Sequence, residues 1–256
     1  MIAVAGAGGA LGSQICDRLR AAGADLRELR RPEVDLTAPA TISLEGVDCV
    51  VSTATAFPRT DAIDAVDRDG NIALLDAAER AGVARLVFVS FKPVPLDFPL
   101  QRAKRAVEER LARAELDAVV LRPAKFMDIW FSPLCGFDAA QRRATIFGDG
   151  TRPVSWIAAS DVAGVAARAA LGDGEGTIEL GGPEALSQRE AVQVFEDVLG
   201  GPWTLVEMPV AELERRLASA NAVESSLAGV MLESHLGSVA PPVGTTTVRE
   251  FASRLA

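Results

Sequence analysis

Short apolar runs alternate with amphipathic segments along the first half of the chain. The runs predict buried β-strands over residues 2–5, 25–29, 47–53, 85–90 and 117–121. The segments between them predict helices over residues 10–22, 71–81 and 102–114. In the first helix, Leu11, Ile15 and Leu19 lie four residues apart and so share one face. Because parallel strands need a crossover helix, this alternation predicts an α/β fold with a doubly wound parallel sheet.

The second half of the chain has a different pattern. Residues 126–137 are irregular and aromatic, and residues 148–151 form a turn cluster. We expect a helix over 160–171 with Ser160 as its N-cap, a short strand over 177–180, and a helix capped by Ser187 and Glu190. Helices dominate after residues 203–208. We therefore expect residues 1–125, completed by 153–182, to form the sheet domain, and residues 126–152 and 183–256 to form a smaller, mostly helical region packed on it.

Composition narrows the class of protein. The chain has 256 residues, of which 49% are apolar and 24% charged, as in globular proteins. A net charge of −9 argues against nucleic-acid binding, which depends on neutralising phosphates. One histidine and three scattered cysteines make no metal site, and they predict reduced thiols in a cytoplasmic protein. No apolar run is long enough to span a membrane, and the first strand starts too early for a signal peptide. Monomer and homodimer both remain open.

A glycine-rich turn follows the first strand and opens the first helix. Gly6, Gly9 and Gly12 have G-x-x-G-x-x-G spacing. The first glycine would make the tight turn, the second would admit a pyrophosphate to the backbone, and the third would let helix and strand pack closely. The helix N-terminus favours negative charge. We expect the turn, together with Ala10 and Leu11, to contact a dinucleotide.

The end of the second strand bears on the choice of cofactor. An acid there binds the ribose hydroxyls of NAD, whereas an arginine accommodates the 2′-phosphate of NADP. Arg30 and Arg31 lie just past the strand, and Glu28 lies inside it. The sequence therefore favours NADP(H) over NAD(H) and leaves open which arginine reads the phosphate. Two solvated surface arginines are the alternative interpretation.

The order of these motifs resembles the NmrA-like branch of the atypical short-chain dehydrogenases/reductases. Beyond the glycine turn, the resemblance rests on residues 29–32, 35–37, 46–52, 69–78, 81–83, 88–90, 103–108, 121–123, 160–163 and 181–187. It covers essentially the whole chain. It implies a Rossmann-type fold and an NAD(P)-dependent oxidoreductase that acts on a small organic substrate.

The resemblance also implies further cofactor contacts, which come from Asp35, Leu36, Thr53, Ala54, Thr55, Ser90 and Pro123. The first pair would flank the adenine, and the three residues after the third strand would line the ribose and nicotinamide end. Backbone after the proline would hold the carboxamide. Lys104 would hydrogen-bond the nicotinamide ribose, and residues 126–150 with the C-terminal helices would shape the substrate pocket.

One departure from the family affects the expected mechanism. Many members carry Tyr-x-x-x-Lys with tyrosine as general acid, but Leu100 stands four residues before Lys104 and the chain has no tyrosine. Lys92 is a second candidate catalytic group beside the nicotinamide, or else an exposed loop lysine. We expect a quinone or activated enone as substrate, because its reduced form is already a stabilised anion. A non-catalytic NADP(H)-sensing protein and a redox-neutral isomerase or cyclase are the alternatives.

Other polar and aromatic residues have simpler interpretations. His235 is expected to be a surface or satisfied helix residue. The acidic residues before the second helix predict a solvated helical face, formed by Asp61, Asp64, Asp67 and Asp69. An aromatic pocket and core packing explain the aromatic residues of the second half about equally well, these being Trp130, Phe131, Phe137 and Trp156.

Overall fold

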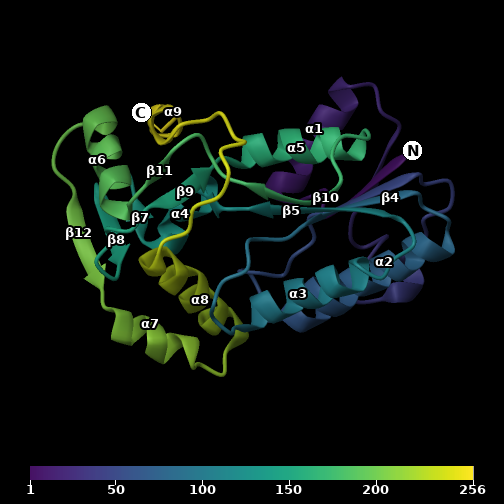
Figure 1. Ribbon diagram of the computed structural model, residues 1–256, viewed down its shortest axis with the longest axis horizontal. Coiled ribbons are helices and arrows are strands. Elements are labelled where there is room, and N and C mark those ends of the chain that lie inside the picture. Colours follow the sequence, from purple (N-terminus) through teal and green to yellow (C-terminus); the bar gives the residue numbers. More distant parts are fainter. Residues whose placement is uncertain (256) are drawn as a thin grey trace.

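The computed structural model describes residues 1–255, and a six-stranded sheet forms its centre (Figure 1). The strands are β1 (Ile2–Ala5), β2 (Leu26–Leu29), β3 (Cys49–Ser52), β4 (Arg85–Val89), β5 (Asp117–Pro123) and β10 (Gly176–Leu180). Their order is β10-β5-β4-β3-β1-β2, and every neighbouring pair is parallel. The predicted doubly wound parallel sheet is confirmed.

Helices cover both faces of this sheet. One face carries α1 (Ala10–Ala21) and α5 (Ala159–Ala170), and the other carries α2 (Asn71–Arg80) and α3 (Pro99–Leu111) (Figure 1). A π-helical segment, η2 (Asp64–Gly70), leads into α2. Successive strand residues point to opposite faces, so Ile2 and Val4 pack with α1 and α5 while Ala3 and Ala5 pack with α2 and α3.

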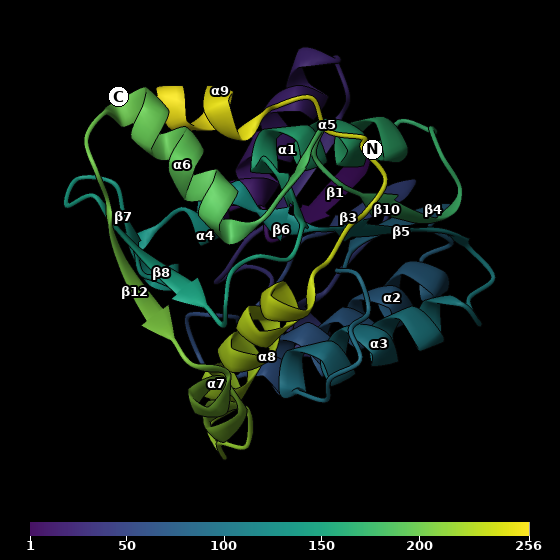
Figure 2. The same ribbon diagram turned by 60° about the vertical axis from the view of Figure 1, so that its left-hand side comes forward.

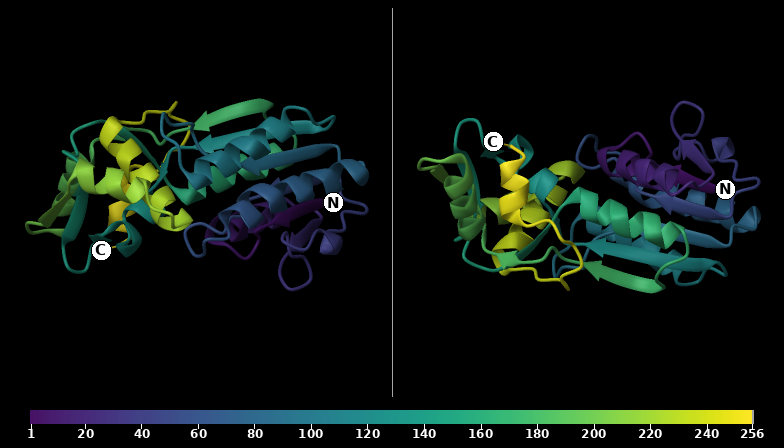
Figure 3. Two further views of the ribbon diagram at one scale, coloured as in Figure 1. Left: turned by 90° about the horizontal axis from the view of Figure 1, so that it is seen from below. Right: turned by 90° about the horizontal axis from the view of Figure 1, so that it is seen from above.

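The remaining elements form a second region beside the carboxyl ends of the strands (Figure 3). Its strands are β6 (Lys125–Phe126), β7 (Phe137–Asp138), β8 (Arg143–Phe147), β9 (Val154–Ile157), β11 (Ala185–Leu186) and β12 (Thr204–Met208), in two sheets of three. Its helices are α4 (Met127–Trp130), α6 (Gln188–Leu199), α7 (Val210–Leu217), α8 (Ala222–Leu236) and α9 (Val248–Ser253). The 3-10 turn η3 (Pro133–Cys135) also belongs to this region, whereas the 3-10 turn η1 (Pro39–Thr41) lies between β2 and β3. The boundaries of the two domains stay a proposal.

The aromatic residues of the second half form the core of this region. Trp130, Phe131, Phe137 and Trp156 are all buried there. The ring of Phe131 lies 4.9 Å from that of Trp156 and 5.1 Å from that of Phe137, measured between centroids. A cavity of only about 20 Å³ remains among them. Their position is therefore that of packed core residues.

Two helix starts differ from the sequence prediction. Helix α5 begins at Ala159, so Ala158 and not Ser160 is its N-cap, and the Asp128 carboxylate accepts a hydrogen bond from the Ala159 amide at 2.7 Å. A carboxylate from a distant segment thus replaces the local cap. Helix α3 begins three residues earlier than expected, at Pro99, whose fixed φ suits a first helical position. The capping box of Ser187 is confirmed.

Candidate functional site

The turn between β1 and α1, residues 6–12, has no room for a side chain at two of its glycines. We call this turn the glycine cradle. Gly6 has φ +80°, and a Cβ there would lie 2.6 Å from Thr53 Oγ1. A Cβ on Gly12 would lie 2.1 Å from the carbonyl oxygen of Gly6. Both positions require glycine, because the turn touches the end of β3 and α1 packs directly on the turn. The two glycines thus allow β1, α1 and the end of β3 to pack closely together.

The N-terminus of α1 is free to receive an anion. Gly9 is the N-cap and supplies no side-chain hydrogen bond, and the first turn, which contains Ala10 and Leu11, has no acidic residue. The amides at a helix N-terminus carry partial positive charge, so an uncapped start attracts phosphate. The cradle and this helix start together fit the pyrophosphate of a dinucleotide.

The acidic residue on β2 is already paired. The Glu28 carboxylate accepts hydrogen bonds from both Arg20 and Arg30. The Arg30 guanidinium also reaches the glycine turn, since a Cβ on Gly8 would lie 3.7 Å from its Nη1. Arg31 is exposed and forms no ion pair with any residue the structure describes. Arg30 therefore lies beside the glycine turn with Arg31 next to it in the chain, and the carboxylate of Glu28 is already ion-paired.

Residues 35–36 lie next to η2. The carboxylate of Asp35 accepts hydrogen bonds from the amide and hydroxyl of Thr37, at 2.9 and 2.8 Å, and these bonds hold the pKa of Asp35 below its usual value. Leu36 packs so close to Gly70 that a Cβ there would lie 2.8 Å from that of Leu36. The segment is fixed beside the start of α2.

The ends of β3, β4 and β5 bring the other predicted residues to the same edge of the sheet. Thr53 follows β3, and its hydroxyl donates to the Ala5 carbonyl at 3.1 Å. Ser90 follows β4, and its hydroxyl accepts a hydrogen bond from Arg105 at 2.9 Å. Pro123 ends β5 and is buried. Ligands of open parallel sheets bind at this edge, so these residues lie at the end of the sheet where a cofactor is expected.

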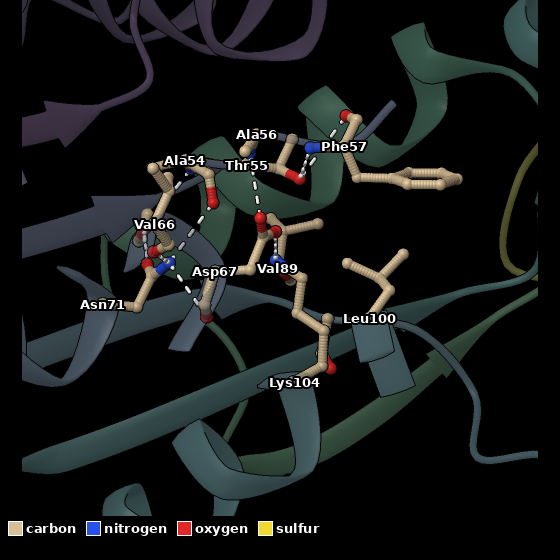
Figure 4. Close-up of polar contacts among 12 residues, drawn as sticks. Ala54, Thr55, Ala56, Phe57, Val66, Asp67, Asn71, Val89, Leu100 and Lys104 are labelled. Atoms are coloured by element: carbon tan, nitrogen blue, oxygen red, sulfur yellow. Dashed lines mark hydrogen bonds and ion pairs between the residues drawn. The ribbon is translucent and has the colours of Figure 1, made fainter. Parts of the chain in front are cut away.

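Lys104 lies on the sheet-facing side of α3 and is almost completely buried (Figure 4). Its ammonium lies 3.4 Å from Asp67 Oδ1 and 3.5 Å from the Val89 carbonyl oxygen, and 5.0 Å from the centre of the Phe88 ring. Burial lowers the pKa of Lys104, and the charge of Asp67 opposes that shift. The two polar contacts are long, so the ammonium retains capacity to donate to a further oxygen.

The structure corrects the prediction for Asp67. It is fully buried, whereas Asp64 and Asp69 on the same segment are 66% and 61% exposed. A signal for this was present in the sequence, because Asp67 lies four residues before Asn71 and thus on the face that α2 buries with Leu74. Sequence reasoning treated the acidic residues as one solvated face and so missed it.

The position of the missing tyrosine is apolar. Leu100 is buried in a cluster with Ile63, Phe98 and Ala103, and Phe57 packs against this cluster. Figure 4 shows Leu100 and Phe57 on the right of Lys104 and Ala54 on its upper left. Leu100 carries no proton donor, so the family's usual acid is absent from this position.

The two other lysines are held by carboxylates. Lys92 donates to the Val239 carbonyl and lies 3.6 Å from Glu179, at the edge of β10. Lys125 is buried against α8, where it pairs with Glu233 and donates to the Val230 carbonyl at 2.9 Å. These contacts do not join either lysine to Lys104. The catalytic role expected of Lys92 stays a prediction.

The cysteines and acidic groups provide no other reactive centre. Burial raises the pKa of Cys49 and of Cys135 to about 11, which keeps both as thiols. Among residues 1–255, no three His, Cys, Asp or Glu side chains lie together as metal ligands would. No helix in that range is long and apolar enough to cross a membrane.

Comparison with known proteins agrees with this geometry. A family model described as NAD(P)H-binding matches residues 33–171. The chain is 33% identical over 224 residues to the (4-alkanoyl-5-oxo-2,5-dihydrofuran-3-yl)methyl phosphate reductase of Streptomyces griseus, covering 82% of this chain and 78% of that protein. In fold it is similar to the NADPH-dependent quinone oxidoreductase QOR2 of Escherichia coli, solved with NADPH, at TM-score 0.78 and 18% identity over 100% of this chain and 99% of that one.

A second group of relatives has a different kind of name. The chain is 30% identical over 183 residues to the photosystem II assembly factor Ycf39 of Synechocystis, covering 68% of this chain and 56% of that protein. It thus spans little more than half of that relative's length. The family match covers more than half of this chain and agrees with the parallel sheet and the glycine cradle. The chain therefore belongs to the NAD(P)H-binding family, in agreement with the resemblance to NmrA-like proteins that its motifs indicate.

Proposed function

We propose that this protein is an NADPH-dependent reductase of small electron-poor substrates, namely quinones or enones activated by a second carbonyl group. The proposal rests on one observation: Lys104 is buried at the site, and the apolar Leu100 occupies the position where a tyrosine acid would stand. Such a site has a cation at the cofactor but no tyrosine to protonate an alkoxide. It suits substrates that do not need that acid.

The preference for NADP(H) follows from the charges at the end of β2. Arg20 and Arg30 neutralise Glu28, so its carboxylate is poorly available to ribose hydroxyls. Arg30 lies beside the glycine turn, and Arg31 is exposed one residue further on. Guanidinium groups bind phosphate with paired N–H donors. We assign the 2′-phosphate chiefly to Arg30.

The chemistry of the substrate replaces the missing acid. The bound nicotinamide supplies a hydride. The substrate named for the Streptomyces reductase has a ring double bond, and one of its carbons carries both an alkanoyl group and a lactone carbonyl. Hydride added to the other carbon leaves the electron pair on the carbon between two carbonyl groups, as a delocalised enolate. Water then protonates the enolate, so that one hydride and one proton have been added across the double bond.

The residues of this chain bind and orient the reactants. The glycine cradle and the α1 N-terminus hold the pyrophosphate, and Pro123 presents backbone to the carboxamide. Lys104 donates to the nicotinamide ribose, and its charge favours the anion that forms nearby. The apolar surroundings of Leu100 exclude water from one side of the site. Lys92 remains a candidate for a further polar contact with the substrate.

The proposal is tested by following NADPH oxidation with a panel of acceptors. We expect turnover with quinones and acyl-substituted butenolides, and none with plain ketones. With an acyl-substituted butenolide as acceptor and deuterium on the transferred position of NADPH, the label should appear on the double-bond carbon that does not carry the acyl group. The variant Leu100→Tyr should gain activity on plain ketones and retain activity on the activated acceptors. Efficient reduction of plain ketones by the unaltered protein would contradict the proposal.

A non-catalytic NADP(H)-binding protein is the second candidate. The resemblance to photosystem II assembly factors favours it, because an assembly factor is named for its action on other proteins. The same panel separates the two functions. Tight NADPH binding without oxidation by any acceptor would support the binding protein and refute the reductase.

A further inference from the structure

Asp67 lies in an unusual helical segment. The segment η2 is π-helical. This geometry is rare in proteins overall, but where it occurs it is frequently found at functional sites. Asp64 and Asp69 point outward from it and pair with Arg68, while Asp67 is fully buried. The segment thus exposes two of its carboxylates to solvent and buries the third beside Lys104.

Asp67 joins two parts of the candidate site. Its Oδ2 accepts a hydrogen bond from the Ala56 amide at 2.9 Å, which fixes the loop after β3 (Figure 4). Its Oδ1 lies 3.4 Å from the Lys104 ammonium and has no hydrogen bond within residues 1–255. Asn71 supports the arrangement, since its amide donates to the carbonyls of Ala54 at 3.3 Å and Val66 at 2.9 Å.

Stability alone is a poor explanation for this pair. Taking a carboxylate and an ammonium out of water is costly, and apolar residues of similar size often replace such a pair without loss of stability. A buried ion pair that leaves one carboxylate oxygen without a hydrogen bond is therefore expected where the charge serves a function. Here the carboxylate touches the lysine that the proposed function assigns to the cofactor.

We propose that Asp67 is a positioning residue that keeps Lys104 charged and directed toward the cofactor while it fixes the loop of residues 54–57. The inference rests on the proposed contact of Lys104 with the cofactor. Asp67 itself does not touch the reacting atoms. Its contribution is to provide the negative charge without which a buried lysine loses its proton.

The charges around Lys104 determine the direction in which Asp67→Asn changes the pKa of Lys104. Asp67 faces it from η2, and Arg105 and Glu108 lie near it on α3 itself. Burial lowers the pKa of Lys104 and the carboxylate of Asp67 raises it. Asp67→Asn removes that support, so Lys104 becomes neutral at a lower pH and the ammonium is lost as pH rises.

Lysine resonances provide a direct test, because the chain has only three lysines: Lys92, Lys104 and Lys125. Protein with carbon-13-labelled lysine is titrated by NMR, and Lys104→Met assigns the signal. In Asp67→Asn we expect the Lys104 signal to titrate about one pH unit or more lower than in the wild type. Asp69→Asn, an exposed change on the same segment, is the matched control and should leave the titration unchanged.

Cofactor affinity supplies the second readout. We expect Asp67→Asn to weaken NADPH binding about tenfold at alkaline pH, with the difference narrowing as pH falls and both proteins carry the ammonium. Asp67→Glu, which keeps the charge, should restore the wild-type pH dependence. An unchanged Lys104 titration, or an equal loss of affinity at every pH, would overturn the proposal.

A folding defect would not remove the test. If Asp67→Asn does not fold, the wild-type Lys104 signal decides: it must report a charged ammonium at neutral pH and shift when NADPH binds. A neutral Lys104, or no shift, would overturn the inference. Neither readout involves turnover, so a protein that binds NADPH but reduces nothing refutes the proposed reaction and leaves this test intact.

Discussion

Single residues at the site differ in whether their charge is already satisfied within the protein. Glu28 has two arginine partners, and Asp67 has a lysine. Arg30 shares its partner with Arg20, and Arg31 has none among residues 1–255. A ligand anion is attracted to the charges that remain incompletely paired. At this scale the incompletely paired guanidinium charge supports the proposal that a phosphate binds at the end of β2.

Replacing Arg30 separates the two cofactors. We expect Arg30→Ala to weaken NADPH binding by about 1.5–3 kcal/mol, the range for a hydrogen bond to a charged group, and to change NADH binding little. Titration calorimetry with both cofactors measures the difference. Arg31→Ala is the matched variant and should cost less, because it lies one residue further from the glycine turn. Equal losses for NADPH and NADH would show that Arg30 does not read the 2′-phosphate.

At the scale of elements, the site depends on the close packing of α1 on the turn that precedes it. The glycines of this turn are not equivalent. A Cβ on Gly12 would meet the Gly6 carbonyl oxygen at 2.1 Å, whereas a Cβ on Gly8 would meet only the Arg30 side chain, at 3.7 Å. The spacing of the motif therefore corresponds to a real difference in available space.

Alanine at these two positions should have opposite outcomes. Gly12→Ala pushes α1 away from β1, so we expect it to destabilise the fold by about 1–3 kcal/mol and to abolish measurable cofactor binding. Gly8→Ala should leave stability within about 0.5 kcal/mol of the wild type. Urea unfolding and NADPH fluorescence titration check both variants. If Gly12→Ala binds NADPH normally, the cradle is not the cofactor site.

At the scale of the whole molecule, α8 connects the second region to the sheet. The Ser226 hydroxyl accepts a hydrogen bond from the Leu100 amide at 3.1 Å, at the start of α3. One turn further along the helix, the Val230 carbonyl accepts from Lys125, which also pairs with Glu233. Figure 2 shows α8 beside α3, next to the carboxyl ends of the strands. The helix thus borders the proposed substrate side of the site.

The buried pair on α8 should be important for stability. Removing one partner leaves an unpaired buried charge, so we expect Glu233→Gln or Lys125→Met to cost about 3–5 kcal/mol. The double variant Lys125→Met with Glu233→Leu should recover most of that loss. The exposed pair Arg249–Asp197 is the control, and Arg249→Met should cost no more than about 1 kcal/mol. Chemical denaturation measures all four proteins. Single variants that cost no more than the exposed control would contradict this account.

Features that depend on local pattern were predictable from the amino-acid sequence alone. The periodicity of apolar residues predicted the strands and helices of the parallel sheet, because a strand buried on both faces and a helix buried on one have different repeats. The glycine turn was predictable for the same reason, since its φ angles and close contacts are requirements on the residues of the turn itself. The absence of a tyrosine was likewise evident from the sequence alone.

Which charged side chains contact each other depends on the packing of distant segments. Asp67 contacts Lys104 across 37 positions of the chain, and Lys125 contacts Glu233 across 108. No local repeat encodes such pairs, because they depend on how separate elements pack. Acidic residues with the same local appearance also acquired different environments, because Asp67 is packed inside the protein whereas Asp64 and Asp69 face solvent. The sequence contained the groups of the site, and packing determined which of them remain free to bind a ligand.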